Sequence, residues 1–221
     1  MSDWAIIFDV DGVLLKLTRQ EEELFFRPFA MRINAAQLSR DWNSYNIRND
    51  EEIVKEIVAR HHLAPHEAEV ITAEYLALLE SELAGPLKSK PIAGASELLA
   101  AFAPHARLGI ATANFRKAAE LRLSQAEMWL PVARLAYGAN GGGHKADILA
   151  RAIAASGLPP ERVIFIGDNV NDVVAGQHNK AQFIGFAQDA ARRDKLAQAG
   201  ARRLAADHTQ TAGFIHAILS A

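Results

Sequence analysis

The sequence predicts an α/β protein in which a doubly wound, Rossmann-like parallel sheet carries an inserted helical cap domain. Short apolar runs recur along the chain, and their nearly continuous apolarity is typical of strands that are covered on both faces. From about residue 92 onward these runs alternate with stretches of helical period, which indicates parallel strands joined by helical crossovers. The part of the chain between the first run and this alternation has helical periodicity only.

The elements of the sheet domain follow from these patterns. Strands are expected at residues 4–8, 107–111, 132–137, 163–166 and 183–187. Amphipathic helices are expected around residues 118–126 and 148–153, between successive strands. The second helix should stop at Gly157, because a glycine at a helix end followed by Pro159 and Pro160 is a helix stop signal.

The segment from Lys16 to about Lys90 interrupts the alternation. Asn49 followed by three acidic residues is a helix start, and after Pro65 a second long apolar stripe of helical period begins. No strand is expected in this segment, which is longer than an ordinary crossover and suits a small helical bundle over one edge of the sheet. We therefore expect a core domain of residues 1–15 and 91–221 and a cap domain of residues 16–90.

Composition excludes several classes of protein. The 221 residues include no cysteine, which removes disulfide scaffolds, thiolate metal sites and cysteine nucleophiles. A net charge of -2 gives no basic field for nucleic acid, and no apolar run approaches the roughly 20 residues that span a bilayer. The first residues lack the basic character of a signal peptide, so we expect a cytoplasmic protein, monomeric or homodimeric, with neither nucleic-acid nor membrane partners.

Two carboxylates stand where the first expected strand ends. Asp9 and Asp11 are two residues apart, and Gly12 follows them. In an open α/β sheet, ligands bind at the carboxyl ends of the strands, and two acids so close repel unless a cation lies between them. The alternative is a solvated turn in which Gly12 supplies a positive φ.

A second acidic pair strengthens the case for a metal site. Asp168 follows the strand expected at 163–166, and Asp172 lies one helical turn further on. Taken alone, Asp168 could be a helix N-cap and Asp172 a favourable charge near a helix N-terminus. Two strands that both end in carboxylates at one sheet edge favour a hard cation held by oxygen ligands.

Two further residues suit an anion beside that cation. Thr112 ends the strand expected at 107–111 and could cradle a phosphate with the backbone N–H groups that follow, or could simply cap the next helix. Lys145 follows a glycine-rich stretch at a helix start, where an ammonium is unfavourable unless an anion is near. This stretch is not a P-loop, because His144 stands at the position of the required lysine and Ala146 at that of the hydroxyl.

Asp9-Val10-Asp11-Gly12-Val13, Thr112, Lys145 and Gly167-Asp168 followed by Asp172 resemble, in order and setting, the four motifs of the haloacid dehalogenase-like superfamily. The resemblance covers essentially the whole chain, and the helical segment resembles the superfamily's helical cap. Two departures concern the Thr and Lys motifs. Ala113 stands before Asn114, where members often have Asn directly after the Thr, and Ala146 replaces a common proline. Arg116 and Lys117 are therefore alternative phosphate-binding cations.

The resemblance implies a role for each motif residue. Asp9 would be the nucleophile and Asp11 the general acid and base, with Thr112 and Lys145 completing the catalytic set. Mg²⁺ would be held directly by Asp9, Asp168 and the carbonyl of Asp11, with Asp172 either as a further ligand or just outside the ligands. The substrate phosphate would be bound by Thr112, Ala113, Asn114 and Lys145.

These roles describe a Mg²⁺-dependent phosphatase that hydrolyses a small phosphorylated metabolite through an aspartyl-phosphate, in the phosphoglycolate phosphatase-like branch. The acid at Asp11 argues against dehalogenation, because the superfamily's dehalogenases lack it. Two alternatives stay open: a hexose-phosphate mutase of the β-phosphoglucomutase type, and a non-catalytic, phosphate-binding regulatory protein. Intact Asp9, Asp11, Asp168 and Asp172 argue against the last.

Substrate choice is expected to depend on the cap. Cationic or hydrogen-bonding cap residues could complement the non-reacting end of a metabolite. The candidates are Arg19, Arg27, Arg32, Arg40, Tyr45, Asn46 and Arg48. Trp42 and Tyr45 are expected to belong to the apolar core of the cap.

Overall fold

Six parallel strands form the centre of the molecule in the computed structural model, which describes residues 3–220. The strand order is β5-β4-β1-β6-β7-β8, so β1 lies in the middle of the sheet between β4 and β6. The strands are β1 (Ala5–Phe8), β4 (Arg107–Ala111), β5 (Leu135–Tyr137), β6 (Val163–Gly167), β7 (Gln182–Phe186) and β8 (Leu204–Ala205). This confirms the predicted Rossmann-like α/β class.

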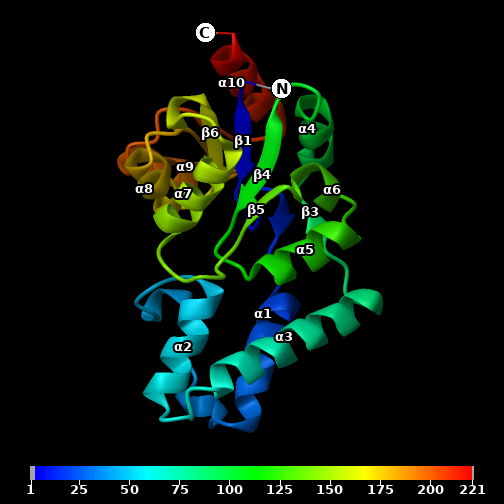
Figure 1. Ribbon diagram of the computed structural model, residues 1–221, viewed down its shortest axis with the longest axis vertical. Coiled ribbons are helices and arrows are strands. Elements are labelled where there is room, and N and C mark those ends of the chain that lie inside the picture. Colours follow the sequence, from blue (N-terminus) through cyan, green and yellow to red (C-terminus); the bar gives the residue numbers. More distant parts are fainter. Residues whose placement is uncertain (1–2, 221) are drawn as a thin grey trace.

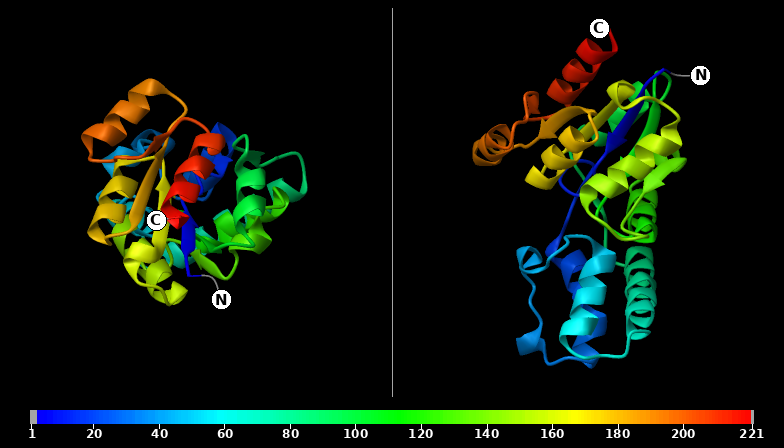
Figure 2. Two further views of the ribbon diagram at one scale, coloured as in Figure 1. Left: turned by 90° about the horizontal axis from the view of Figure 1, so that it is seen from above. Right: turned by 60° about the vertical axis from the view of Figure 1, so that its left-hand side comes forward.

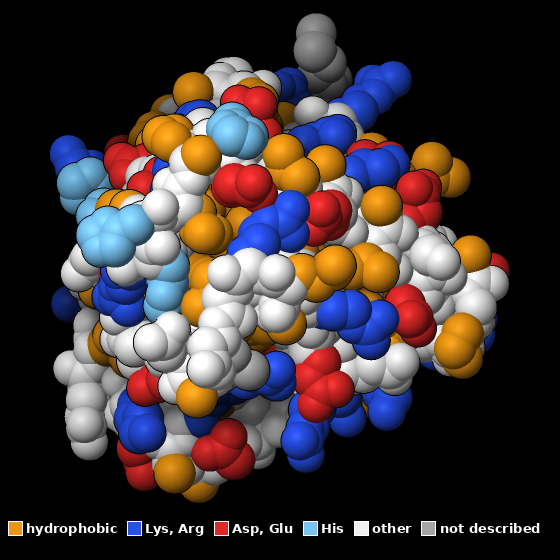
Figure 3. Space-filling model, turned by 90° about the horizontal axis from the view of Figure 1, so that it is seen from below, with side chains coloured by type: hydrophobic (Ala, Val, Ile, Leu, Met, Phe, Trp, Pro, Cys, Tyr) orange, Lys and Arg blue, Asp and Glu red, His pale blue; other side chains and the backbone are white. Residues whose placement is uncertain are grey.

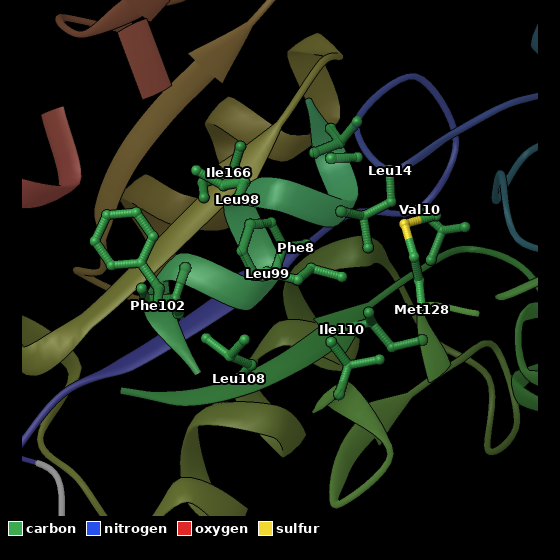
Figure 4. Close-up of a cluster of buried hydrophobic side chains, with 14 of the residues drawn as sticks. Phe8, Val10, Leu14, Leu98, Leu99, Phe102, Leu108, Ile110, Met128 and Ile166 are labelled. Carbon is green, nitrogen blue, oxygen red and sulfur yellow. The ribbon is translucent and has the colours of Figure 1, made fainter. Parts of the chain in front are cut away.

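Helices cover both faces of this sheet (Figures 1 and 2). They are α4 (Ala95–Phe102), α5 (Arg116–Gln125), α6 (Trp129–Val132), α7 (Lys145–Ser156), η4 (Pro160–Arg162), α8 (Val170–His178), α9 (Ala190–Gln198) and α10 (His208–Leu219). On one face, α7 and α8 pack over side chains such as Ile7 and Phe165. On the other face α4, α6 and α10 pack over Phe8, Ile110 and Ile166, a cluster that Figure 4 shows in close-up.

Two details of the sheet differ from the sequence prediction. The strand expected at 132–137 begins only at Leu135, because Trp129–Val132 form a short helix and Val132 contributes its buried side chain from there. The first turn of this helix tolerates Pro131, because a backbone N–H at this position would have no intrahelical partner. The strand β8 was not predicted, because two residues carry too short a pattern to stand out.

The chain between residues 16 and 90 forms a helical lobe beyond the carboxyl ends of the strands, and we call it the cap (Figure 1). It contains α1 (Arg19–Phe26), η1 (Arg27–Met31), η2 (Ala35–Gln37), η3 (Trp42–Ser44), α2 (Asp50–Arg60) and α3 (Glu67–Ala84). Asn49 caps α2 as its sequence suggested, accepting a hydrogen bond from the Glu52 N–H.

A small antiparallel ribbon lies where the chain passes between sheet domain and cap. Its strands are β2 (Leu15–Lys16) and β3 (Lys90–Pro91), with Lys16 paired to Lys90. The expectation of no strand from Lys16 to Lys90 was therefore wrong at both ends of that segment. Two-residue strands leave no periodic signal, and their pairing joins positions that are far apart in the sequence.

The cap has an apolar core of its own, which extends onto the sheet domain. Phe25, Phe29 and Ile57 are buried in it together with Phe115 and Ala118, which belong to the start of α5. Tyr45 is buried in this core and Trp42 packs against it, as expected from the sequence. The cap therefore rests on α5 through apolar contacts that continue its own core.

Candidate active site

Three neighbouring strands end beside one another and place the predicted residues at one edge of the sheet. Asp9 follows β1, Thr112 follows β4 and Asp168 follows β6. Their strands are in register, because Phe8 is aligned with Ile110 of β4 and Ile166 of β6. Parallel strands bring their carboxyl ends to the same edge, so three segments that are remote in sequence converge there.

Asp9, Asp168 and Asp172 form a buried group whose candidate ligand oxygens all lie within 4.8 Å of one another. Glycines make the close approach possible. A Cβ on Gly12 would lie 1.9 Å from Oδ2 of Asp168, and one on Gly167 would lie 2.3 Å from Cβ of Asp172. Three buried carboxylates of this kind form a ligand set suited to a hard cation.

Asp172 has two functions in this geometry. One carboxylate oxygen accepts hydrogen bonds from the N–H groups of Asp168 and Asn169 at 3.2 and 3.0 Å, which completes a capping box at the start of α8. The other oxygen lies 3.1 Å from Nζ of Lys145. The helix N-cap itself is Asn169, so the alternative N-cap interpretation of Asp168 was wrong.

Lys145 lies within the acidic group. Its Nζ is 2.7 Å from Oδ1 of Asp9, and the side chain is largely buried. The alternative cations Arg116 and Lys117 instead pair with Glu120 on α5. Of the three candidate cations, the structure brings only Lys145 to the acidic group.

Burial and mutual repulsion disfavour negative charge on these acids. Burial raises the pKa of Asp9 to about 8, with Asp172 and Asp168 adding to the rise and Lys145 opposing it. Burial also raises the pKa of Asp168 to about 7, together with repulsion from Asp172. Burial works against the charge of Lys145, but Asp172 and Asp9 raise the pKa of this ammonium. A divalent cation among the carboxylates would relieve the remaining repulsion, so the residues present fit a metal.

Asp11 lies outside the three-acid group. Its Oδ1 accepts a hydrogen bond of 2.7 Å from Nη2 of Arg122, a buried residue of α5. The Nε of Arg122 donates to Glu21 of the cap, also at 2.7 Å. Sequence reasoning missed Arg122, although an arginine between Leu121 and Leu123 in an amphipathic helix is a polar residue beside the buried stripe.

The loop after β4 joins the site to the cap. Thr112 is buried, and its Oγ1 accepts a hydrogen bond from the Asn114 N–H at 3.2 Å. The helix that follows is capped at Phe115 instead, so the interpretation of Thr112 as its N-cap was wrong. Asp50 of the cap donates its N–H to the Ala113 carbonyl, and its carboxylate accepts from the Phe115 N–H at 2.8 Å.

A cavity of about 360 Å³ lies between the sheet edge and the cap. Its sheet-domain wall contains Asp9, Asp11, Thr112, Ala113, Asn114, Lys145, Asp168 and Asp172, which is the full set of predicted site residues. Its cap wall contains Leu17, Glu21, Glu22, Phe25, Trp42, Arg48, Asn49, Asp50, Ile53 and Tyr75. Trp42 therefore contributes to this wall as well as to the cap core.

Of the seven cap candidates for substrate contact, only Arg48 lines the cavity. Arg19, Arg27 and Arg32 pair with cap glutamates. Arg40 stacks over the ring of Phe26, while Tyr45 and Asn46 bond to Ser39 and Glu56. Figure 3, viewed from the cap end, shows acidic and basic side chains interspersed on that face.

A parallel sheet, acids and a lysine at the carboxyl ends of its strands, and a helical cap above them define a capped, Rossmann-like α/β protein with a candidate metal and anion site. The chain belongs to the haloacid dehalogenase-like hydrolase family, whose sequence model matches residues 5–179. No curated protein matches the sequence. None of the helices between residues 3 and 220 is long and apolar enough to cross a membrane.

Solved structures with the same fold come from several bacteria. A predicted phosphatase from Clostridium acetobutylicum is 17% identical, with a TM-score of 0.73 over 98% of this chain and 100% of that one. CbbY from Rhodobacter sphaeroides, solved in complex with phosphate, is 22% identical, with a TM-score of 0.70 over 94% and 95%. A putative β-phosphoglucomutase from Bacteroides vulgatus is 17% identical, with a TM-score of 0.70 over 99% and 90%. At these identities the likeness concerns the fold.

Proposed function

We propose that this protein is a Mg²⁺-dependent phosphatase that hydrolyses a small phosphomonoester metabolite through an aspartyl-phosphate. One observation carries the proposal. The carboxylate of Asp9 lies 2.7 Å from Lys145 and within 4.8 Å of two further acids, in the cavity between the sheet edge and the cap. A nucleophile beside both a cation and a candidate metal group suits attack on an anionic phosphorus.

Asp9, Asp168 and Asp172 would hold the Mg²⁺, with the carbonyl of Asp11 as a further oxygen ligand. When bound, the ion supplies positive charge that offsets the repulsion between the Asp9 carboxylate and the substrate phosphate. Lys145 adds a second cation, and Thr112 with the N–H group of Ala113 offers donors to the phosphoryl oxygens. These donors stabilise charge in the transition state of phosphoryl transfer.

Two displacements complete the reaction. A carboxylate oxygen of Asp9 bonds to phosphorus while the ester oxygen leaves, and Asp11 donates the proton that turns this oxygen into an alcohol. Asp11, now ionised, takes a proton from a water molecule whose oxygen attacks the phosphorus. Inorganic phosphate departs and the Asp9 carboxylate is restored. Such acid and base assistance is typically worth about 10²- to 10⁴-fold in rate.

The test is phosphate release from 4-nitrophenyl phosphate and a panel of phosphorylated metabolites, with and without Mg²⁺. Asp9→Asn should lower turnover by at least about 10³-fold, since it removes the nucleophile. Asp194→Asn is a matched control on an exposed position of α9 and should leave turnover unchanged.

Three outcomes would contradict the proposal. Absence of Mg²⁺-dependent phosphate release from every ester of the panel would exclude a phosphatase of this kind. A phosphorylated isomer formed in place of free phosphate would indicate the mutase alternative. Tight phosphate binding by a folded protein that turns nothing over would favour the regulatory one.

A further inference from the structure

Arg122 joins four parts of the molecule through one buried guanidinium. Its Nη2 donates to Asp11 and its Nε to Glu21, both at 2.7 Å. Nη1 lies 3.3 Å from Oδ1 of Asn114, and Nη2 also lies 3.4 Å from the carbonyl of Lys16 in the ribbon strand β2. The arginine therefore contacts the proposed acid–base residue, the cap, the loop after β4 and the ribbon that joins cap and sheet domain.

Glu21 is itself fixed in place. Its second carboxylate oxygen accepts hydrogen bonds from the N–H and Oγ1 of Thr18, at 2.8 and 2.7 Å, in the capping box that starts α1. Side chains of both Glu21 and Arg122 are only 3% exposed. Removing either partner of such a pair leaves an uncompensated buried charge. The pair therefore links cap helix α1 firmly to helix α5.

The bonds of Arg122 leave part of the Asp11 carboxylate available. Both the hydrogen bond and the ion pair go to Oδ1 of Asp11, and the Asp11 side chain, which is 22% exposed, lines the cavity. A planar guanidinium can hold two carboxylates at fixed angles at once, which a lysine ammonium on a flexible stem does less well. The contact therefore restricts the orientation of Asp11 without burying all of it.

We propose that Arg122 is a positioning residue, anchored by Glu21 of cap helix α1, that holds the carboxylate of Asp11 in place for proton transfer. This inference rests on the proposed function, because it takes Asp11 as the group that protonates the leaving oxygen. The cap then takes part in orienting the acid as well as covering the cavity. Its first helix fixes the arginine, and the arginine orients the acid, so the proton donor is complete only with α1 seated against α5.

Leaving groups separate this role from a merely structural one. An alkyl phosphomonoester needs its leaving oxygen protonated, whereas 4-nitrophenolate is a weak base that departs without a proton. The experiment measures kcat/KM for both esters in wild type, Arg122→Lys and Glu21→Gln, because kcat/KM reports the step in which the first alcohol leaves. Both variants should lose roughly 10- to 100-fold on the alkyl ester and less than about threefold on 4-nitrophenyl phosphate.

Two controls complete the design. Arg32 is also held by two carboxylates, those of Glu67 and Glu74, but within the cap and away from the cavity. Arg32→Lys should leave the ratio of the two kcat/KM values unchanged. In an Asp11→Asn background, Arg122→Lys should cause no further loss on the alkyl ester, because the group on which it acts has lost its proton transfer.

Equal losses on both esters in folded variants, or a full additional loss in the Asp11→Asn background, would overturn the inference while leaving the phosphatase proposal intact. If Arg122→Lys fails to fold, as judged by circular dichroism, Glu21→Gln decides alone. A wild type that releases no phosphate from either ester contradicts the proposed function, and the inference falls with it.

Discussion

The two walls of the cavity are built in different ways. On the sheet-domain wall, Asp168 and Asp172 are four residues apart and Asp9 ends the neighbouring strand, so backbone geometry alone brings them together. On the cap wall, Glu22 lies on α1 while Arg48 lies just before α2 and Asp50 begins it, and none of these three belongs to an ion pair of the described residues. The acids of the first wall are compensated by Lys145 and by Arg192, which lies 2.8 Å from Asp168. On the second wall Glu21 pairs with Arg122, whereas Glu22, Arg48 and Asp50 have no ionic partner among the described residues.

The difference separates chemistry from selectivity. Groups fixed at strand ends and neutralised by one another suit a reaction that is the same for every substrate. Ionisable groups without ionic partners on a separate lobe suit recognition of whatever the phosphate is attached to, because no opposite charge of the protein compensates them. We therefore expect substitutions in the sheet-domain wall to abolish turnover on all substrates. Substitutions in the cap wall should change the relative activities toward different substrates.

Lys145 offers the strongest test of the first half of this comparison. Lys145→Gln removes the cation beside Asp9 and should lower kcat by about 10²- to 10³-fold on every substrate, since it stabilises charge that develops on the phosphoryl group. Lys117→Gln is the control, because Lys117 pairs with Glu120 away from the cavity. A kcat near the wild-type value for Lys145→Gln would mean that another cation holds the phosphate.

Gly12 tests whether the acids must approach one another closely. It has φ +79°, and an added Cβ would lie 1.9 Å from Oδ2 of Asp168. Gly141 has φ +92° with no atom within 4 Å of an added Cβ, so it isolates the backbone cost. We expect each alanine variant to lose about 1 kcal/mol of stability for its backbone conformation.

Only Gly12→Ala should also displace a metal ligand. The rise in Tm that Mg²⁺ causes in wild type should therefore be reduced in Gly12→Ala and kept in Gly141→Ala. Equal Mg²⁺ responses in the two variants would show that Asp168 takes no part in holding the ion. This measurement needs no substrate, so it tests the metal group separately from turnover.

The two walls also differ in how far the sequence reveals them. Asp9, Asp168 and Thr112 were predictable because each follows a buried apolar strand, and strand order at a parallel sheet edge brings such ends together. Lys145 follows a long loop, yet its place at a helix start already suggested an anion nearby. Glycine and helix-start signals are local, so a single sequence displays them.

Contacts across the cap are not local and left no such signal. Arg122 bonds to Glu21 and Asp11, which are 101 and 111 residues away in the sequence. Asp50 looked like one more acid in the first turn of a helix, where it is favourable without any partner. Its contacts with Ala113 and Phe115 depend on how the cap rests on α5, which hydrophobic periodicity does not encode.

Asp50 gives the cap wall a predicted pH dependence. Burial raises its pKa from 3.8 to about 7, against the hydrogen bond from the Phe115 N–H. A carboxyl whose pKa is higher in the folded than in the unfolded protein keeps its proton longer when folded. The stability that this proton contributes is fully present below about pH 4 and is lost as the pH rises through about 7.

Asp50→Asn should therefore flatten the decline in the free energy of unfolding between pH 4 and 7, because an amide does not ionise. The difference in the free energy of unfolding between the variant and wild type should grow by at least about 1 kcal/mol from pH 4 to pH 7. Urea unfolding in saturating Mg²⁺ measures it, since the ion keeps Asp9 and Asp168 from titrating in the same range. Parallel curves for the two proteins would contradict the raised pKa.

Arg48 should have the smallest effect and the most selective one. It is an exposed cation on the cap wall with no acidic partner among the described residues, so it is available to a second negative group on a substrate. An exposed ionic contact contributes roughly 0.2–1 kcal/mol, which corresponds to at most a few-fold in KM. Arg48→Gln should therefore raise KM a few-fold for substrates with a second anionic group, at unchanged kcat. The KM for phosphate esters of uncharged alkyl groups should stay the same.

Arg40→Gln is the control, because Arg40 stacks on Phe26 and does not line the cavity. Substrate-independent changes in KM would contradict the role in selectivity, and a fall in kcat would place Arg48 with the chemistry of the opposite wall.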